Sequence, residues 1–388
     1  MSYKLKVKIA SLLFSVLAFS ASLSANGSNL KSVNDSKSLS ASEIKIDKDL
    51  EPYKGEISSF LTNEKDRLIS AFKFSKRPFI GHWIADILMY PGANRVISKF
   101  VNTTSSSFES LYNQAEEFGV LRKSEIKTSD DLYVGAVLDN REDPKDSDPV
   151  IVCFGGNAHL SIELVLNMVK SGRKGEFICF DRPGYGKSPL GDNVLCEDLQ
   201  RKYVDSAMNY VQETYPSRKI IVVGHSLGGF EASCALKNFG NKIFEAYLFA
   251  PASVKGAERS VLGVLGLTDL FVEIMAHYGE SLLAWDSLDS MDNLVNVESS
   301  TKVYLCSGVP FYYSNTEKKY FGDFLSCYYT ALEESEPLHD KPSDDVLRSF
   351  ESKIETIMKE RNENLNIVVK MFDCDHSGID NMFSIMSF

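Results

Sequence analysis

The chain has 388 residues, an apolar fraction of 44% and a formal net charge of −11. This length allows one large α/β domain with an extension, and the acidic balance argues against nucleic acid as a partner. The histidines are scattered, and neither an H-E-x-x-H motif nor paired C-x-x-C motifs occur, so the sequence predicts no metal site.

The N-terminus has the order of a secretory signal: lysines, a mainly apolar run at residues 9–23, then small residues. As a helix this run would span about 22 Å, which is short of the roughly 30 Å of hydrocarbon in a bilayer. We therefore expect residues 1–25 to be a signal peptide that exports the chain to a periplasm or out of the cell. The alternatives are a permanent membrane anchor at residues 9–23 and an amphipathic helix kept in a cytosolic protein.

Two segments of different composition follow. Residues 26–43 are rich in serine, asparagine and lysine, which predicts a flexible tether. Residues 44–117 carry apolar stripes at helical spacing and no recognised motif, so they predict a helical extension that precedes the main domain.

Two apolar runs predict buried strands that end in unusual loops. Residues 149–154 lead into G-G-N-A at 155–158, and residues 176–180 lead into D-R-P-G-Y-G-K-S at 181–188. The end of the second loop is similar to a phosphate-binding loop, but Asp181 stands where that motif needs its first glycine. We therefore expect a rigid turn under a binding pocket rather than a nucleotide site.

The most informative motif follows the β-branched run at residues 220–223, which breaks into G-H-S-L-G at 224–228. This is the G-x-S-x-G nucleophile elbow, in which a strained turn between a strand and a helix needs small residues two positions to either side of the serine. Small and helix-compatible residues continue to Leu236. Ser226 is therefore the predicted nucleophile of a serine hydrolase. The alternative is a serine in an ordinary tight turn.

Together, these motifs resemble those of the α/β-hydrolase superfamily over residues 118–388. The order of elements is also similar, with an early strand at 132–138, helical stretches at 160–170 and 196–214, and a strand at 246–250 after the elbow. The resemblance implies the α/β-hydrolase fold, a mostly parallel sheet flanked by helices. Within the superfamily, the G-N-A loop is similar to that of the branch containing lipid and acyl-protein hydrolases.

The resemblance also implies an oxyanion hole. Its donors would be the backbone N–H groups of Asn157, in the first loop, and Leu227, directly after the nucleophile. Such fixed dipoles act because they already point to where negative charge develops, and losing one costs about 100-fold to 1,000-fold in rate. The usual superfamily loop is His-Gly-Asn-Ala, and Gly155 replaces its histidine here. This change leaves the backbone role intact.

The superfamily places its catalytic histidine in the loop after the last strand. Here that strand is Asn366–Phe372, and His376 follows it. Histidine suits a general base because its pKa lies near neutral pH. The order serine, acid, histidine along the chain would also match.

The catalytic acid is harder to assign, because no carboxylate stands at the usual offset after the strand predicted at 301–306. Asp340 precedes the helix that leads into the last strand, as the superfamily acid does, provided that residues 309–337 are a helical insertion. Asp323 is the second candidate. A solvated surface charge is the alternative interpretation of both.

Residues 253–299 hold the expected helical cap insertion. Its segments 261–267 and 270–275 are strongly apolar, which suits an acyl-chain or lipid substrate and contact of the cap with a membrane surface. The alternative is that these residues, like the aromatic residues of the later insertion, pack onto the main core.

The sequence thus predicts a serine hydrolase that cleaves carboxylic ester or thioester bonds of a small-molecule ester or lipid through an acyl-serine intermediate. This chemistry needs no cofactor. Acyl transfer and peptide cleavage would use the same residues. The alternative function is a catalytically silent hydrolase fold that binds a lipid or a partner protein.

Overall fold

The chain divides into two compact units, Met1–Met89 with Leu262–Trp285 and Tyr90–Val261 with Asp286–Phe388. The computed structural model describes only residues of the second unit, and all that follows concerns them. The described residues are 104–128, 130, 132–157, 159–190, 197–251, 290–297, 301–310, 312–314, 316, 319–321, 338–374 and 378–388. The predicted signal peptide and tether, and most of the predicted extension and cap, lie outside the described residues.

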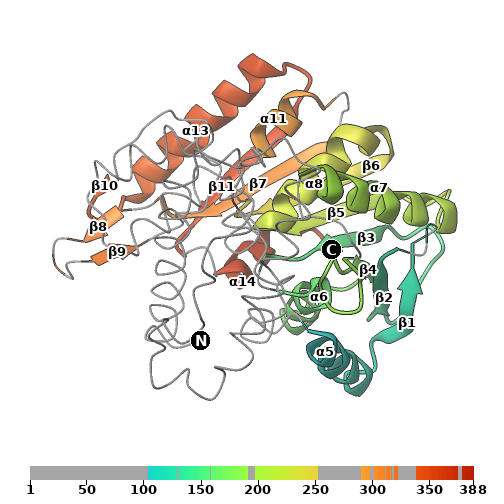
Figure 1. Cartoon of the computed structure of the whole chain (residues 1–388). Helices are drawn as coiled ribbons and strands as arrows, with labels where there is room; N and C mark the ends of the chain where they lie inside the picture. Colours follow the sequence, from blue (N-terminus) through green and yellow to red (C-terminus); the bar gives the residue numbers. More distant parts are fainter. Residues whose placement is uncertain are drawn as a thin grey trace, which may run out of the picture. The chain divides into compact units, whose positions relative to one another are not determined.

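A sheet of eight strands, in the order β1-β2-β4-β3-β5-β6-β7-β11, forms the centre of this unit (Figure 1). Pairing is antiparallel between β1 and β2 and between β2 and β4, and parallel between all other neighbours. The predicted mostly parallel sheet is therefore confirmed. The strands are β1 (Leu121–Lys127), β2 (Val134–Asp139), β3 (Val150–Phe154), β4 (Glu176–Phe180), β5 (Ile220–His225), β6 (Ile243–Phe249), β7 (Lys302–Gly308) and β11 (Asn366–Phe372).

The strands at the centre of the sheet are mostly apolar because helices cover both of its faces. Every residue of β3 and of β5 is buried. One face is covered by α5 (Ser105–Glu117), α6 (Ser161–Lys170) and α14 (Ile379–Met382), whose side chains share one core cluster with strand residues such as Ile151 and Val223. Figure 1 shows the other helices on the opposite face; they are α7 (Glu197–Thr214), α8 (Leu227–Phe239), α11 (Ser290–Val295) and α13 (Asp344–Arg361).

Helix α5 is the described end of the predicted helical extension, and it packs as part of the main core. Phe108, Tyr112 and Ala115 point from one side of the helix into the core cluster. The Tyr112 hydroxyl donates a hydrogen bond of 2.7 Å to the carbonyl of Gly135 in β2. The side chain of Thr104 caps the helix by accepting the N–H of Ser107.

The insertion after β7 differs from the prediction. Its described part contains β8 (Tyr312–Ser314) and β9 (Lys319–Phe321), which pair antiparallel, and β10 (Leu338–His339) pairs with β8 in parallel. The expectation of a helical insertion is therefore wrong for this part. The physical reason is local: the aromatic pairs at 312–313 and 320–321 flank the polar stretch S-N-T-E-K-K, and aromatic residues favour strands while polar residues favour the turn between them.

Candidate active site

The predicted nucleophile, Ser226, lies in the turn between β5 and α8. Its backbone has φ +57° and ψ −119°, a conformation that L residues rarely adopt. Its N–H donates to the carbonyl of Phe249 in β6 at 2.9 Å, and its carbonyl accepts the N–H of Gly229 at 2.9 Å. The predicted order of strand, strained turn and helix is therefore confirmed, and such strain persists only where the surrounding structure imposes it.

Close packing explains the glycines on both sides of this serine. A Cβ atom at Gly224 would overlap the backbone carbonyl of Gly228 and lie 2.8 Å from the Cβ of Ala232. A Cβ atom at Gly228 would overlap the carbonyl oxygens of Phe154 and Gly155. The first turn of α8 thus lies directly against the end of β3, where the G-G-N-A loop begins.

This packing brings the two predicted oxyanion donors to the same edge of the sheet. Leu227 is the first residue of α8, so its N–H has no acceptor within the helix and lies at the positive end of the helix dipole. Asn157 follows β3, and the strand pairs 154–224 and 153–223 hold β3 beside β5. The imidazole of His225 lies beside this loop, because a Cβ at Gly156 would lie 3.0 Å from its Nδ1.

The carboxyl ends of β5, β6, β7 and β11 stand in register at this edge. The pairs are His225 with Phe249, Phe249 with Cys306, and Gly308 with Phe372. The loop that carries the predicted histidine therefore begins at the same edge as Ser226. His376 itself lies outside the described residues.

Asp340 directly follows β10, with its side chain exposed and its backbone at φ +67°. Its neighbour Lys341 forms an ion pair of 2.6 Å with Asp373, the first residue after β11. The segment that carries Asp340 is thus tied to the loop that carries residue 376. The second candidate acid, Asp323, lies outside the described residues, so both assignments of the acid stay predictions.

Comparison with known families agrees with this architecture. Residues 148–271, which include the G-G-N-A loop and the serine turn, match the family model of the alpha/beta hydrolase fold. The chain has the α/β hydrolase fold. No curated protein matches it.

Many solved structures of hydrolases are distantly similar to the chain. An esterase of Pyrococcus furiosus is 17% identical, covering 68% of this chain and 85% of that chain, with a TM-score of 0.43. The naproxen esterase of Bacillus subtilis is 14% identical, covering 71% and 93%, with a TM-score of 0.39. A membrane phospholipase A described as a bacterial virulence factor is 11% identical, covering 70% and 85%, with a TM-score of 0.42.

Beneath the serine turn of this α/β hydrolase fold lies a buried ion pair that the sequence analysis did not predict. Arg182 and Glu231 are 2% and 0% exposed, and Glu231 belongs to α8. Burial opposes the charge of Arg182, but the Glu231 carboxylate nonetheless raises the pKa of the guanidinium. A sequence signal was available: one glutamate interrupts an otherwise small and apolar stretch of α8, and an arginine directly follows a buried strand.

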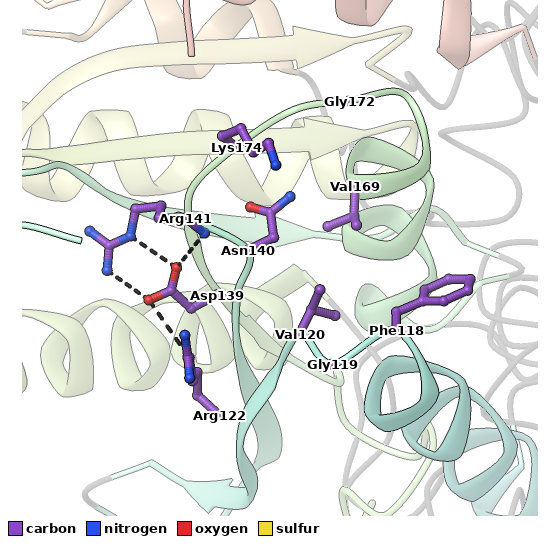
Figure 2. A pocket seen from close by; sticks show the side chains of 10 residues that line it. All are labelled: Phe118, Gly119, Val120, Arg122, Asp139, Asn140, Arg141, Val169, Gly172 and Lys174. Atoms are coloured by element: carbon purple, nitrogen blue, oxygen red, sulfur yellow. Dashed lines mark hydrogen bonds and ion pairs between the residues drawn. The ribbon is translucent and has the colours of Figure 1, made fainter. Parts of the chain in front are cut away.

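The hollow drawn in Figure 2 belongs to the opposite edge of the sheet and not to this site. It has a volume of about 370 Å³ and adjoins Asp139, which pairs with Glu176 at the amino end of β4. Figure 2 shows that Arg122 and Arg141 both point at the Asp139 carboxylate. Within the described part of the chain, no cluster of three or more His, Cys, Asp or Glu could hold a metal ion. Nor is any helix there long and apolar enough to cross a membrane.

Proposed function

We propose that the chain is a serine hydrolase that cleaves carboxylic ester or thioester bonds. The observation that carries this proposal is the Ser226 turn, where a left-handed backbone places a serine between a buried strand and the positive end of a helix. Such a strained turn is what a nucleophile requires if it is to stand clear of the sheet.

In the proposed reaction, Ser226 Oγ attacks the substrate carbonyl while His376 takes its proton. The N–H groups of Asn157 and Leu227 stabilise the resulting oxyanion, and Asp340 orients His376. The tetrahedral intermediate collapses to an acyl-serine as His376 returns the proton to the departing alcohol or thiol. Water, activated by the same histidine, then releases the acid and restores Ser226.

The proposed substrates carry an acyl chain. Support comes from the sequence of the cap, whose apolar segments at 261–267 and 270–275 would complement a hydrocarbon chain better than a polar substrate. A panel of p-nitrophenyl esters of increasing chain length tests this point. Preference for the long esters is expected, and a preference for acetate would contradict the acyl-chain proposal while leaving the serine mechanism intact.

We also propose that residues 1–25 export the chain, on the basis of their charge, apolar run and small residues. Expression with a C-terminal tag, followed by fractionation and N-terminal sequencing, would check this proposal. A mature chain that begins near residue 26 outside the cytoplasm is expected. An uncleaved chain in the membrane would instead support an anchor at residues 9–23.

A fluorophosphonate probe, which labels activated serines, tests the nucleophile. We expect the wild type to be labelled and Ser226→Ala to be unlabelled and at least about 1,000-fold less active on esters. The matched control is Ser233→Ala, in the helix that follows the turn. Within the described residues, the Ser233 hydroxyl donates to the carbonyl of Phe230 and accepts a hydrogen bond from the side chain of Asn293. Equal labelling of wild type and Ser226→Ala would end the proposal, and a folded but inert wild type would favour a binding protein.

Kinetics can test the roles of the other two proposed catalytic residues, His376 and Asp340, separately. His376→Ala should lower kcat about as much as Ser226→Ala, because residues that act as a unit are not additive. Asp340→Asn should lower kcat by roughly 1,000-fold or more if Asp340 orients the histidine. If Asp340→Asn keeps wild-type activity while Asp323→Asn loses it, the acid is Asp323.

A further inference from the structure

The buried side chain of Arg182 binds the G-G-N-A loop through two hydrogen bonds. Its Nη1 donates to the carbonyl of Gly156 at 2.8 Å and its Nη2 to the carbonyl of Gly155 at 2.5 Å. Arg182 lies in the turn after β4, so this contact joins two loops at the same edge of the sheet. Both accepting carbonyls belong to the stretch directly before Asn157.

Tyr185, from the same turn, holds the next residue of the loop. Its hydroxyl lies 2.7 Å from the carbonyl oxygen and 2.9 Å from Oδ1 of Asn157. The ring of Tyr185 is 1% exposed and packs at 5.0 Å from the guanidinium of Arg182. Two side chains thus bind three consecutive carbonyls, and the N–H of Gly155 is bound in turn by the hydroxyl of Ser161 at 3.1 Å.

These contacts determine where the N–H of Asn157 points. A peptide group is planar and trans, so the N–H of one residue is antiparallel to the C=O of the residue before it. Since Arg182 binds the carbonyl of Gly156, it fixes the plane that contains the N–H of Asn157. A charge-assisted hydrogen bond to a peptide carbonyl also polarises that peptide, which makes its N–H a stronger donor.

Glu231 connects this arrangement to the nucleophile. Its two oxygens accept Nε and Nη2 of Arg182, each at 2.9 Å, and it stands five residues after Ser226 in α8. Glu231 therefore holds the guanidinium in a fixed position relative to the helix that begins directly after the nucleophile. Only the planar fork of arginine can bind one carboxylate and two carbonyls together in this way.

We propose that Arg182, Tyr185 and Glu231 are positioning residues that aim the N–H of Asn157 at the oxyanion, in register with Ser226. This proposal rests on the proposed serine hydrolase function. The residues act through the peptide group and do not touch the substrate. Their contribution should consequently appear in the transition state and not in substrate binding.

The first test compares two buried tyrosines that each bind backbone. In Tyr185→Phe we expect kcat to fall about tenfold to a hundredfold with KM within twofold, because the oxyanion donor is misaimed rather than removed. A trifluoromethyl ketone, which forms a tetrahedral adduct with an active serine, should bind more weakly by the same factor. The matched control is Tyr112→Phe, which should leave kcat unchanged because its hydroxyl bonds the carbonyl of Gly135 in β2 and the N–H of Glu125 in β1 rather than the G-G-N-A loop.

The second test uses Arg182→Lys, which keeps the charge but loses the fork. We expect kcat to fall about a hundredfold and amide exchange of the peptide covering residues 155–160 to accelerate, while exchange in β5 and β6 stays as in the wild type. The double substitution Arg182→Gln with Glu231→Gln removes both buried charges, so no unpaired charge is left in the core. This variant should also have a low kcat, because the fork of arginine is lost.

The outcomes separate this proposal from the function on which it rests. Suppose that Ser226→Ala abolishes activity, while Tyr185→Phe and Arg182→Lys behave like the control Tyr112→Phe in kcat, ketone affinity and amide exchange. The positioning role is then overturned, and the serine hydrolase proposal stands. If KM rises as kcat falls, or exchange accelerates throughout the domain, the ion pair has only a structural role. If wild type and Ser226→Ala are equally inactive, both proposals fail.

Discussion

The turn that holds Ser226 has no room for a side chain at Gly224. A methyl group there would overlap the carbonyl of Gly228, which belongs to the first turn of α8. Backbone at this contact is part of the helix and of the sheet behind it, so neither neighbour can move independently. The glycine is therefore required by the close approach of two main chains, not by its own backbone angles.

We predict that Gly224→Ala lowers the free energy of unfolding by about 1–3 kcal/mol and kcat/KM by about 100-fold, since a shift of roughly 1 Å at a nucleophile has such an effect. Urea unfolding and ester kinetics measure the two quantities. Gly172→Ala is the control: its backbone is left-handed at φ +86°, but no atom lies within 4 Å of the added methyl. That variant should be about 1 kcal/mol less stable and fully active. Normal activity in Gly224→Ala would contradict the packing argument.

Asp181 is a buried carboxyl group beside the positioning arginine. Its Oδ1 accepts the N–H of Ser161 at 3.1 Å, while Oδ2 faces Gly186 and has no hydrogen-bond partner in the described part of the chain. Burial raises the pKa of Asp181 to about 7, despite the bond from Ser161 and the charge of Arg182. An unfolded chain would have a pKa near 3.9 at this residue.

Between about pH 4 and pH 7 the folded chain therefore holds a proton that the unfolded chain has lost, and stability falls as the pH rises through this window. Asp181→Asn cannot titrate at this position. We predict that the stability of Asp181→Asn relative to the wild type rises by about 3 kcal/mol as the pH increases from about 5 to about 8. Urea unfolding at both pH values measures the difference. The same substitution at the exposed Asp345 controls for the loss of one carboxylate. A constant difference between wild type and Asp181→Asn would show that Asp181 does not titrate in this range.

At the scale of elements, the free edge of the sheet at β11 is covered by glutamates of α13. Glu355 accepts the N–H of Val369 at 2.9 Å and Glu351 accepts the N–H of Met371 at 2.8 Å. The two glutamates are four residues apart, so they lie on the same side of the helix and meet alternate N–H groups of the strand. Strand β11 is the last in the sheet, and these carboxylates occupy donors that could otherwise pair with another chain.

We expect Glu355→Ala to lower the free energy of unfolding by about 1–2 kcal/mol, because it leaves a partly buried N–H without its acceptor. Glu355→Gln keeps an acceptor oxygen and should lose less than half as much. The exposed Glu360→Ala, in the same helix, is the control for the change in helix propensity and charge. Urea unfolding and light scattering at high protein concentration measure the effects. Equal stability of Glu355→Ala and Glu360→Ala would rule out the edge-covering role.

At the scale of the whole unit, the hydrolase core begins before the region that matches the family. Helix α5 precedes that region by more than thirty residues, yet Phe108 is 2% exposed and packs in the main core cluster. The segment after this helix forms β1, which adds an antiparallel edge to the sheet. The helix is thus part of the folding unit and not an appendage.

Two phenylalanines of this segment provide a direct test. We predict that Phe108→Ala destabilises the protein by about 3–5 kcal/mol, as expected for a large side chain removed from a packed core. Phe118→Ala, at a side chain that is 47% exposed, should cost well under half of that. Thermal or urea unfolding of the full chain compares them. Similar small effects would mean that α5 contributes little to the core.

The local units of the fold were predictable from the sequence. The limits of β4 and β11 agree with those expected, and β3, β5, α6 and α7 agree within two residues. The reason is that each of these signals is contained in a short window: a continuous apolar run, a glycine-rich turn or a helical spacing. The serine turn belongs to the same class, because the two glycines that permit it stand next to it in the chain.

Strand β1 and the small sheet of β8, β9 and β10 were not predicted, because their local sequences do not distinguish a strand from a loop. In β1 only Ile126 is buried, and register shifts break the alternation that would mark a strand. The three strands of the small sheet are two or three residues long and depend on one another. Such elements form only when a partner is already in place.

The sequence by itself thus determined the fold class, the serine turn and the order of the motifs around it. Only the tertiary structure decided which residues meet beneath that turn. Arg182 and Glu231 are 49 positions apart, and Tyr185 and Asn157 are 28 apart. No local pattern specifies such a pair, because a buried charge is stable only beside the partner that the sheet and its helices bring to it.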